Sequence, residues 1–264
     1  MKNRQEFERQ RERRDQRVAA IGSLAIFGAI VGAYGVLTDL THALDPVLFP
    51  GWGVILPEMW RAAGELGTGL AYSLRLLLPA LAAAIALGIV CGLAVGMHPR
   101  AKLVLMPLFR ALNPIPPTML IPYAIAVLPS FWLSSAAIIF IGVFWPVLMG
   151  TLHGVTMLEP RWIDNARCLQ LSGWRLVRKV VLPGAMPQIF AGIGSGLVFS
   201  FILLTVAEMF GTKAGMGFYV QYYADFAEYG RVLGGILFLS AVVIALMTIF
   251  DRVQRRVLHW TKKR

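Results

Sequence analysis

Residues 71–97 read AYSLRLLLPALAAAIALGIVCGLAVGM, and no charged side chain follows Arg75 in this stretch. An α-helix needs about 20 mostly apolar residues to cross a bilayer, so this segment predicts a membrane-spanning helix. The composition of the whole chain agrees: 57% of its 264 residues are hydrophobic and 15% are charged, whereas a soluble domain carries about 25% charged residues. The sequence therefore predicts an all-α membrane protein.

Six stretches of the chain are long and apolar enough to be transmembrane helices. They cover residues 18–37, 71–97, 103–128, 134–152, 187–209 and 231–250. The third is the least regular because prolines interrupt it, and proline removes a backbone donor and kinks a helix. In lipid, such backbone is tolerated only where protein or a cavity covers it. We therefore expect the third span to bend against other protein or a cavity.

Small residues four positions apart predict how the spans pack. Glycines with this spacing are Gly28 and Gly32; Gly88, Gly92 and Gly96; Gly192 and Gly196; and Gly230 and Gly234. Such spacing lets helix backbones approach closely in lipid. We interpret the glycines as packing positions of a tight helical bundle.

Basic residues predict the orientation, since Lys and Arg are enriched on the cytoplasmic side of a membrane. Of the 25 Lys and Arg residues, 21 lie in the tail 1–17, in the stretch 100–110, in the loop 153–186 and in the tail 251–264. The spans place all four segments on one side, so both termini are expected in the cytoplasm. The net charge of +11 is thereby explained without nucleic acid.

This orientation divides the chain into segments. A basic cytoplasmic tail, the first transmembrane helix and a periplasmic segment precede the core transmembrane domain, and a second basic tail follows it; their residues are 1–17, 18–37, 38–70, 71–250 and 251–264. The core domain includes the cytoplasmic loop 153–186.

Motifs for catalysis and nucleotide binding are missing from the sequence. It contains no GxxxxGK[ST] loop, no GxSxG elbow and no HExxH helix, and Cys91 and Cys168 lack CxxC spacing. Glu208 is the only carboxylate inside a predicted span, whereas proton-coupled carriers and membrane proteases normally hold several ionisable groups at mid-depth. We expect a transport subunit rather than an enzyme, with energy supplied by a partner.

The loop 153–186 is expected to fold into two short helices. Pro160 suits the first turn of a helix, and Thr156 with Glu159 resembles a capping box. A first helix is therefore predicted over residues 160–170. Its apolar side chains lie on one face, those of Trp162, Ala166 and Leu169, with Ile163 beside them.

The second helix of the loop is predicted over residues 173–181, with Ser172 capping its start and Leu182-Pro183 ending it. An ordinary connecting loop is the alternative interpretation. However, a helix that exposes large apolar side chains outside the bilayer needs the rest of the protein or a partner groove to cover it.

At this loop the sequence resembles a known family. The run Asp164-Asn165-Ala166-Arg167, followed by Gly173 and by Val181-Leu182-Pro183, is similar to the EAA loop of binding-protein-dependent ABC transporter permeases. Further segments resemble the nitrate, sulfonate and taurine branch in the right order: Arg110-Ala-Leu-Asn-Pro-Ile-Pro-Pro117, Phe144-Trp-Pro146, Gly154-Val155, Ala207-Glu208-Met209 and Gly215-Met-Gly217. The resemblance covers roughly residues 70–255.

The sequence also departs from the family pattern. The Glu-Ala-Ala of the family is Asp164-Asn165-Ala166 here, and its arginine early in the second span is displaced by one position to Arg75. The segment 128–135 replaces a Gly-x-Gly-x-x-Ser-Lys motif. Gln170 stands where the family has a loop glycine, and we expect it to keep ordinary right-handed backbone dihedrals.

The resemblance implies a type I ABC importer permease fold with six transmembrane helices and a cytoplasmic coupling helix, in a bacterial inner membrane. Two copies of this permease would work with two ATPase subunits, which hold the ATP and Mg, and with a periplasmic or lipoprotein substrate-binding protein. The chain itself would hold no cofactor. The branch suggests a small anion such as taurine, another sulfonate, nitrate or bicarbonate; heterocyclic or aromatic cargo is the alternative.

Two sets of site residues follow. For docking on the ATPase they are Trp162, Ile163, Asp164, Asn165, Ala166, Arg167, Leu169, Gln170, Gly173, Leu182 and Pro183. For the translocation pathway or its gate they are Asn113, Pro114, Pro116, Pro117, Phe131, Trp132 and Glu208.

Each pathway residue has a structural alternative. The prolines can simply enforce a bend, and Phe131 and Trp132 can belong to an interfacial aromatic belt. Glu208 can act as a cap or form a salt bridge with Lys213 or Arg75. Two other classes of protein also remain open: a secondary transporter that works without an ATPase, and a membrane-embedded enzyme, which would need a polar catalytic cluster at membrane depth.

Overall fold

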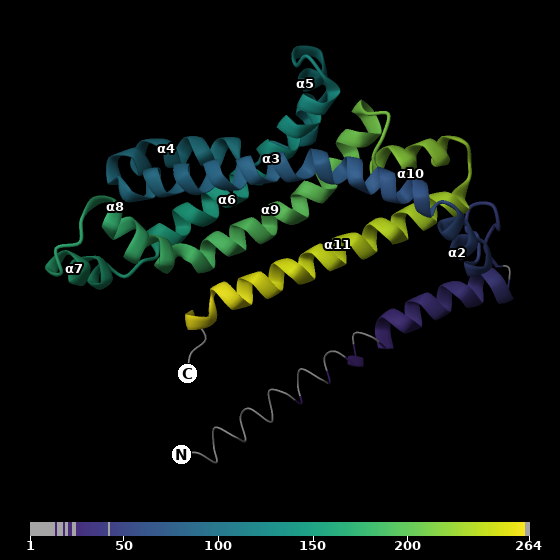
Figure 1. The fold of residues 1–264 in the computed structure, drawn as a ribbon, viewed down its shortest axis with the longest axis horizontal. Coiled ribbons are helices and arrows are strands. Elements are labelled where there is room, and N and C mark those ends of the chain that lie inside the picture. The colour runs from purple at the N-terminus through teal and green to yellow at the C-terminus, as the bar shows by residue number, and fades with distance from the viewer. Residues whose placement is uncertain (1–13, 15–17, 19–20, 23–24, 42, 262–264) are drawn as a thin grey trace. The chain divides into compact units, whose positions relative to one another are not determined.

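The computed structural model describes residues 14, 18, 21–22, 25–41 and 43–261, and it is helical without a strand among them (Figure 1). The predicted tail 1–17 lies outside these residues except for Arg14. The first predicted span, 18–37, is described in part. Its described portion belongs to the apolar helix Ala25–Leu40, which ends in the π-helix η1 (Val36–Leu40).

The remaining elements follow in chain order. They are α2 (Trp52–Arg61), α3 (Ala63–Met97), α4 (Pro99–Leu112), η2 (Pro117–Leu120), α5 (Ile121–Val127), α6 (Phe131–Thr156), α7 (Pro160–Cys168), α8 (Gly173–Leu176), η3 (Val177–Val181), α9 (Leu182–Gly211), α10 (Met216–Asp225), α11 (Tyr229–Val257) and η4 (His259–Thr261).

Four helices among the described residues are long and apolar enough to cross a membrane: α3, α6, the continuous helix Gly173–Phe210 and α11. Each contains one predicted span. The helix α3 begins eight residues before the predicted start at 71; residues 63–70 contain no proline, and the helix continues through their three glycines.

The third predicted span, 103–128, is not one straight helix. It consists of Pro99–Leu112 and Pro117–Val127, which meet at an angle of 78° and make a fifth candidate span if they cross the membrane together. Pro114, Pro116 and Pro117 cause the break, since none of them can donate a backbone hydrogen bond. The expected bend is therefore confirmed.

Glycines bring α3, α6 and α9 into close contact, and the three helices run side by side in Figure 1. A Cβ at Gly150 of α6 would lie 2.7 Å from the carbonyl oxygen of Gln188 and 2.9 Å from the Cα of Gly192, both on α9. A Cβ at Gly92 of α3 would lie 2.9 Å from the carbonyl oxygen of Leu148 on α6. The predicted packing role is thus confirmed for Gly92 and Gly192, and Gly150 is a further packing position that was not predicted. At Gly28 and Gly32, by contrast, a Cβ would meet nothing within 4 Å.

The chain divides into two compact units, each with its own contacts. The smaller unit combines residues 1–62 with 223–234, and the larger one combines 63–222 with 235–264. In the smaller unit, Glu58 of α2 accepts hydrogen bonds from Arg231 Nε at 3.2 Å and from Arg61 Nη1 at 2.7 Å. The Arg231 guanidinium also lies over the ring of Tyr223, 4.7 Å from its centroid.

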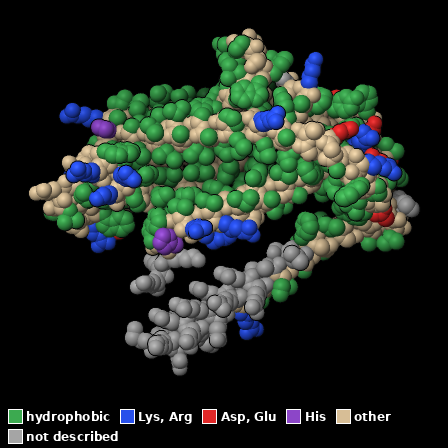
Figure 2. Space-filling model, in the orientation of Figure 1, with side chains coloured by type: hydrophobic (Ala, Val, Ile, Leu, Met, Phe, Trp, Pro, Cys, Tyr) green, Lys and Arg blue, Asp and Glu red, His purple; other side chains and the backbone are tan. Residues whose placement is uncertain are grey.

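Charges in the larger unit are unevenly distributed. Lys and Arg side chains gather around the end that carries α7 and α8, whereas the long flank of the helices is almost wholly hydrophobic (Figure 2). An apolar flank with charged ends is the surface that a bilayer requires.

Enlarging a glycine at a close contact between α6 and α9 should destabilise the larger unit. The substitution Gly150→Ala puts a methyl group against the α9 backbone, and overpacking of this kind costs about 1–3 kcal/mol. We expect a lower midpoint of thermal unfolding in detergent. Gly67→Ala is the matched control, since a Cβ there meets nothing within 4 Å. Equal midpoints for the two variants would contradict the packing role of Gly150.

The Glu58 ion pair should make the stability of the smaller unit depend on pH. The hydrogen bonds from Arg231 and then Arg61 lower the pKa of Glu58 below its ordinary value of 4.5. The stabilisation is therefore complete above pH 4.5 and is lost as the pH falls through the lowered pKa. Because the pair is partly exposed, it is worth less than about 1 kcal/mol. Thermal midpoints of wild type and Glu58→Gln, measured between pH 7 and pH 3.5, should converge at the acid end.

Candidate functional site

The first helix of the loop forms where the sequence places it. Pro160 opens α7, which ends at Cys168, two residues before the predicted end. The predicted capping box is wrong: Glu159 is the N-cap without a side-chain bond. The Thr156 hydroxyl instead donates to the carbonyl of Leu152 at 2.8 Å and accepts from Lys102 Nζ at 2.9 Å.

The second helix of the loop does not end at Leu182-Pro183, contrary to the prediction. The elements α8, η3 and α9 form one continuous helix, Gly173–Phe210. A proline clashes with the carbonyl four residues earlier, which for Pro183 belongs to Lys179. That residue lies in the π-helix Val177–Val181, where the wider turn relieves the clash. Ser172 is the N-cap residue, although its side chain makes no capping bond.

Gln170 has a φ of +57°, so the expectation of right-handed dihedrals is wrong. The backbone N–H of Gln170 donates to the carbonyl of Arg167 at 2.8 Å, and that of Leu171 donates to the carbonyl of Ala166 at 3.0 Å. These two bonds form a Schellman motif, which requires a left-handed residue at this position. Gln170 thus adopts the backbone conformation that glycine favours. Gly173, with a φ of +53°, is left-handed as well.

The predicted apolar face of α7 is divided between the interior and the surface. Ala166 is 4% exposed and packs in a cluster with Leu176 and Val181, which the side chain of Ile163 also covers. Leu169 is 75% exposed. The loop is therefore held by its own subunit through Ala166, while a separate apolar surface remains uncovered among the described residues.

The other predicted docking residues surround this arrangement. Leu182 packs against the Ala166 cluster. Half-exposed Trp162 and Pro183 line a hollow of about 510 Å³ together with Lys179 and Trp260. The remaining ones are polar and exposed: Asp164 and Arg167, which lie 3.7 Å apart as an ion pair, and Asn165.

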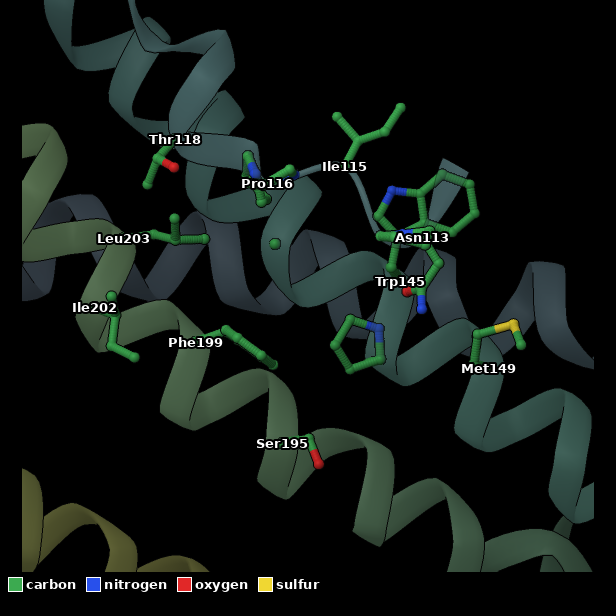
Figure 3. Close-up of a pocket in the computed structure, with 14 residues that line it drawn as sticks. Asn113, Ile115, Pro116, Thr118, Trp145, Met149, Ser195, Phe199, Ile202 and Leu203 are labelled. Carbon is green, nitrogen blue, oxygen red and sulfur yellow. The ribbon is translucent and has the colours of Figure 1, made fainter. Parts of the chain in front are cut away.

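The proline break of the third span borders a cavity of about 560 Å³ (Figure 3). Residues 113–118 form one wall, including the predicted Asn113, Pro114, Pro116 and Pro117. The other walls come from two long helices: Gly142, Trp145, Pro146 and Met149 of α6, and Ser195, Phe199, Ile202 and Leu203 of α9. No lining residue is charged, so the cavity can bind polar groups only through neutral donors and acceptors.

Phe131 and Trp132 do not line this cavity. They lie in the first turn of α6, where both side chains are exposed. The structure thus separates them from the other predicted pathway residues, because α6 runs on for three further turns before it reaches Gly142. Exposed rings at the end of an apolar helix fit the alternative of an aromatic belt.

Glu208 is buried, with no exposed surface, and lies away from the cavity. Its Oε1 accepts from Ser73 Oγ at 2.6 Å, and its Oε2 accepts from the backbone N–H of Gly217 at 2.8 Å. Ser73 Oγ in turn accepts from the N–H of Met216 at 2.9 Å. The alternative of a salt bridge is wrong for the described residues, which show no ion pair of Glu208 with Lys213 or Arg75.

The Glu208 bonds join α3, α9 and the start of α10. Gly215, which precedes α10, has a φ of +112°, and a Cβ there would collide with the carboxyl group of Glu208. Glu208 therefore holds these helices together near the end of the span and does not face the cavity. We call its hydrogen-bonded group of Glu208, Ser73, Met216 and Gly217 the Glu208 clasp.

Sequence reasoning missed several residues that the structure brings to these sites. Trp145, Ser195 and Phe199 line the cavity, and Trp174 of α8 is 69% exposed beside the loop. Ser195 and Phe199 are four residues apart, so the sequence already indicates that they share one face of their helix. It does not indicate whether that face turns toward the cavity or toward lipid. Among the described residues, no group of three His, Cys, Asp or Glu could hold a metal ion.

Among the described residues, four long apolar helices, a proline-broken span and a helical loop define a multi-span helical membrane protein. Residues 84–263 match the binding-protein-dependent transport system inner membrane components. The chain belongs to this family of ABC transporter permeases, in its sulfonate, nitrate and taurine branch.

Three relatives illustrate the branch. The taurine transport system permease protein TauC of Escherichia coli strain K12 is 29% identical over 91% of this chain and 89% of its own. The putative aliphatic sulfonates transport permease protein SsuC of Bacillus subtilis strain 168 is 30% identical over 66% and 63%. The nitrate import permease protein NrtB of Leptolyngbya laminosa is 28% identical over 80% and 77%.

Removing the hydroxyl of Ser73 should loosen the clasp. Ser73→Ala removes the hydroxyl that donates to the buried Glu208 Oε1 and accepts from the N–H of Met216, and losing a buried hydrogen bond costs about 1–3 kcal/mol. We expect a lower thermal midpoint in detergent. The control is Ser240→Ala, because that hydroxyl is exposed and bonds only to its own helix. A Ser73→Ala midpoint equal to that of the control would show that the clasp contributes nothing.

Proposed function

We propose that this chain is the pathway-forming permease subunit of an ATP-driven importer, and that it works as a homodimer with two separate ATPase subunits. An external substrate-binding protein delivers the solute. Membership of a family of binding-protein-dependent transport components supports this assembly. The chain carries out no bond chemistry; ATP and Mg belong to the ATPase.

The proposed topology has six spans with both termini in the cytoplasm. The helix Ala25–Leu40 belongs to the first span, α4 with α5 forms the bent third one, and the four long helices supply the others. The tails 1–17 and 251–264, the segment 38–70 outside and the core 71–250 keep the limits expected from the sequence. The gathering of basic side chains at α7 and α8 supports a cytoplasmic position of the loop (Figure 2).

The observation that carries the proposal is the anchoring of α7. Its buried Ala166 holds the helix to its own subunit, and exposed Leu169 and Trp174 offer an apolar surface for a partner. Shifting a two-state gate from a ratio of 1:99 to 99:1 requires a partner that binds the favoured state about 5.5 kcal/mol more tightly than the other. A loosely attached loop could not transmit this free energy. The unbroken helix Gly173–Phe210 connects this coupling loop to the cavity wall at Ser195 and Phe199.

The proposed cargo is a small organic or inorganic anion. Relatives named for taurine, aliphatic sulfonates, nitrate and bicarbonate support this class. A heterocyclic or aromatic compound is the second candidate, because Trp145 and Phe199 line the cavity and no lining residue is charged.

Co-purification with the ATPase tests the proposal. A permease extracted in mild detergent should bring down an ABC ATPase in stoichiometric amounts, and proteoliposomes should take up solute only with ATP and the binding protein. Uptake by the permease alone would instead identify a secondary transporter.

Charge on the exposed side of α7 should uncouple the two subunits. Leu169→Asp places a carboxylate on the proposed docking surface, where burial without a partner is unfavourable. We expect at least a tenfold loss of transport-coupled ATPase activity, with an unchanged thermal midpoint of the isolated permease. The matched control is Val47→Asp, which is also exposed but lies in the segment 38–70 outside the proposed spans. Ala166→Asp should differ from both by destabilising the permease itself, because Ala166 is buried.

A further inference from the structure

The proline break beside the cavity leaves one backbone carbonyl that the helix cannot use as an acceptor. A carbonyl in a helix accepts from the N–H three or four residues ahead. For Asn113 both positions are prolines, Pro116 and Pro117, which have no N–H. The sequence therefore leaves the carbonyl of Asn113, a residue that lines the cavity, without a helical donor.

Hydroxyl groups around the cavity behave differently from those elsewhere in the bundle. Thr151, Ser200 and Thr205 donate to carbonyls of their own helices at 2.7–2.9 Å. Ser195 and Thr118, which line the cavity, make no side-chain hydrogen bond to another described residue. The carboxamide of Asn113 is likewise unpaired in the described part of the chain. Three polar side chains thus remain available to a molecule in the cavity.

The rest of the lining is apolar. Phe199 and Ile202 are about half exposed on α9, and Met149 of α6 also lines the cavity (Figure 3). A multiply charged anion is excluded on physical grounds, since removing it from water without a fixed counter-charge is too unfavourable. An organic molecule with one polar group matches both the polar and the apolar residues of the lining. The cavity volume of about 560 Å³ lies in the range of small-molecule sites.

We infer that this cavity is a binding site within the permease itself for an organic solute that has an apolar body and one hydrogen-bond-accepting head group of at most a single negative charge. Ser195, Thr118 and the Asn113 carboxamide bind the head group, and Phe199 with Ile202 covers the body. The inference deepens the proposed function and rests on it, because the solute bound here is the one transported.

Binding to the purified permease in lipid nanodiscs tests the site without the ATPase or the binding protein. The probes for calorimetric titration are benzenesulfonate, its neutral analogue methyl phenyl sulfone, and inorganic sulfate. We expect at least one of the two organic probes to bind and sulfate not to bind. Sulfate binding as tightly as the organic probes, or binding of neither organic probe, would overturn the inference.

Two variants with matched controls locate the binding. Ser195→Ala should weaken the organic probe about tenfold, the effect of one lost hydrogen bond to a polar or charged group, whereas Ser200→Ala should not, because that hydroxyl bonds to Leu197. Phe199→Ala should also weaken the probe, whereas Phe210→Ala, at an exposed site near the end of the same helix, should not. Unchanged affinity in both cavity variants would overturn the site.

The outcome for the site can be separated from that for the proposed function. ATP-driven uptake together with absent or variant-insensitive probe binding would refute the cavity site alone. Probe binding that depends on Ser195, in a permease with no ATPase partner, would refute the importer instead.

Discussion

The structure depends on the close approach of α6 to α3 and α9. Gly92, Gly150 and Gly192 bring backbone atoms so near that a methyl group at any of them would overlap a neighbouring helix. Association in lipid relies on such van der Waals packing, because apolar side chains gain no hydrophobic free energy there by leaving the lipid. The same contacts fix the positions of α6 and α9, and hence of the two cavity walls that these helices form.

The helix Gly173–Phe210 links the two candidate sites of the molecule. Its first turns belong to the cluster that buries Ala166, and its middle provides Ser195 and Phe199 to the cavity. A π-helix at Val177–Val181 lets this helix continue through Pro183. A displacement at the loop 153–186 can therefore reach the cavity through one continuous helix, without a separate chain of side-chain contacts.

Hydropathy and proline chemistry were sufficient for much of the fold. The long apolar helices, the bend at Pro114–Pro117 and the glycine contacts follow from side-chain hydropathy, the missing N–H of proline and the missing Cβ of glycine, which tertiary structure does not change. The wrong predictions at Gln170 and Pro183 have a different origin. Gln170 and Pro183 adopt backbone that their residue types disfavour, because a Schellman motif and a π-helix, both formed with neighbouring residues, compensate the cost.

The candidate site was predictable only along the proline break. Asn113 and the three prolines carry their own signal, whereas Trp145, Ser195 and Phe199 belong to spans that are apolar on every side. Which face of such a helix turns inward is decided by its neighbours. Phe131 and Trp132 illustrate the reverse error, since their proximity in sequence to the break does not bring them to the cavity.

The clasp at Glu208 also bears on how the chain enters the membrane. A carboxyl group on an isolated helix is costly in lipid, yet its partner Ser73 lies 135 residues earlier in the sequence. The segment that carries the hydroxyl donor is thus synthesised before the one that carries the acid, whereas the second donor, the N–H of Gly217, follows only nine residues after Glu208. An early and a late segment of the chain must therefore both be present before the carboxyl group has all its partners.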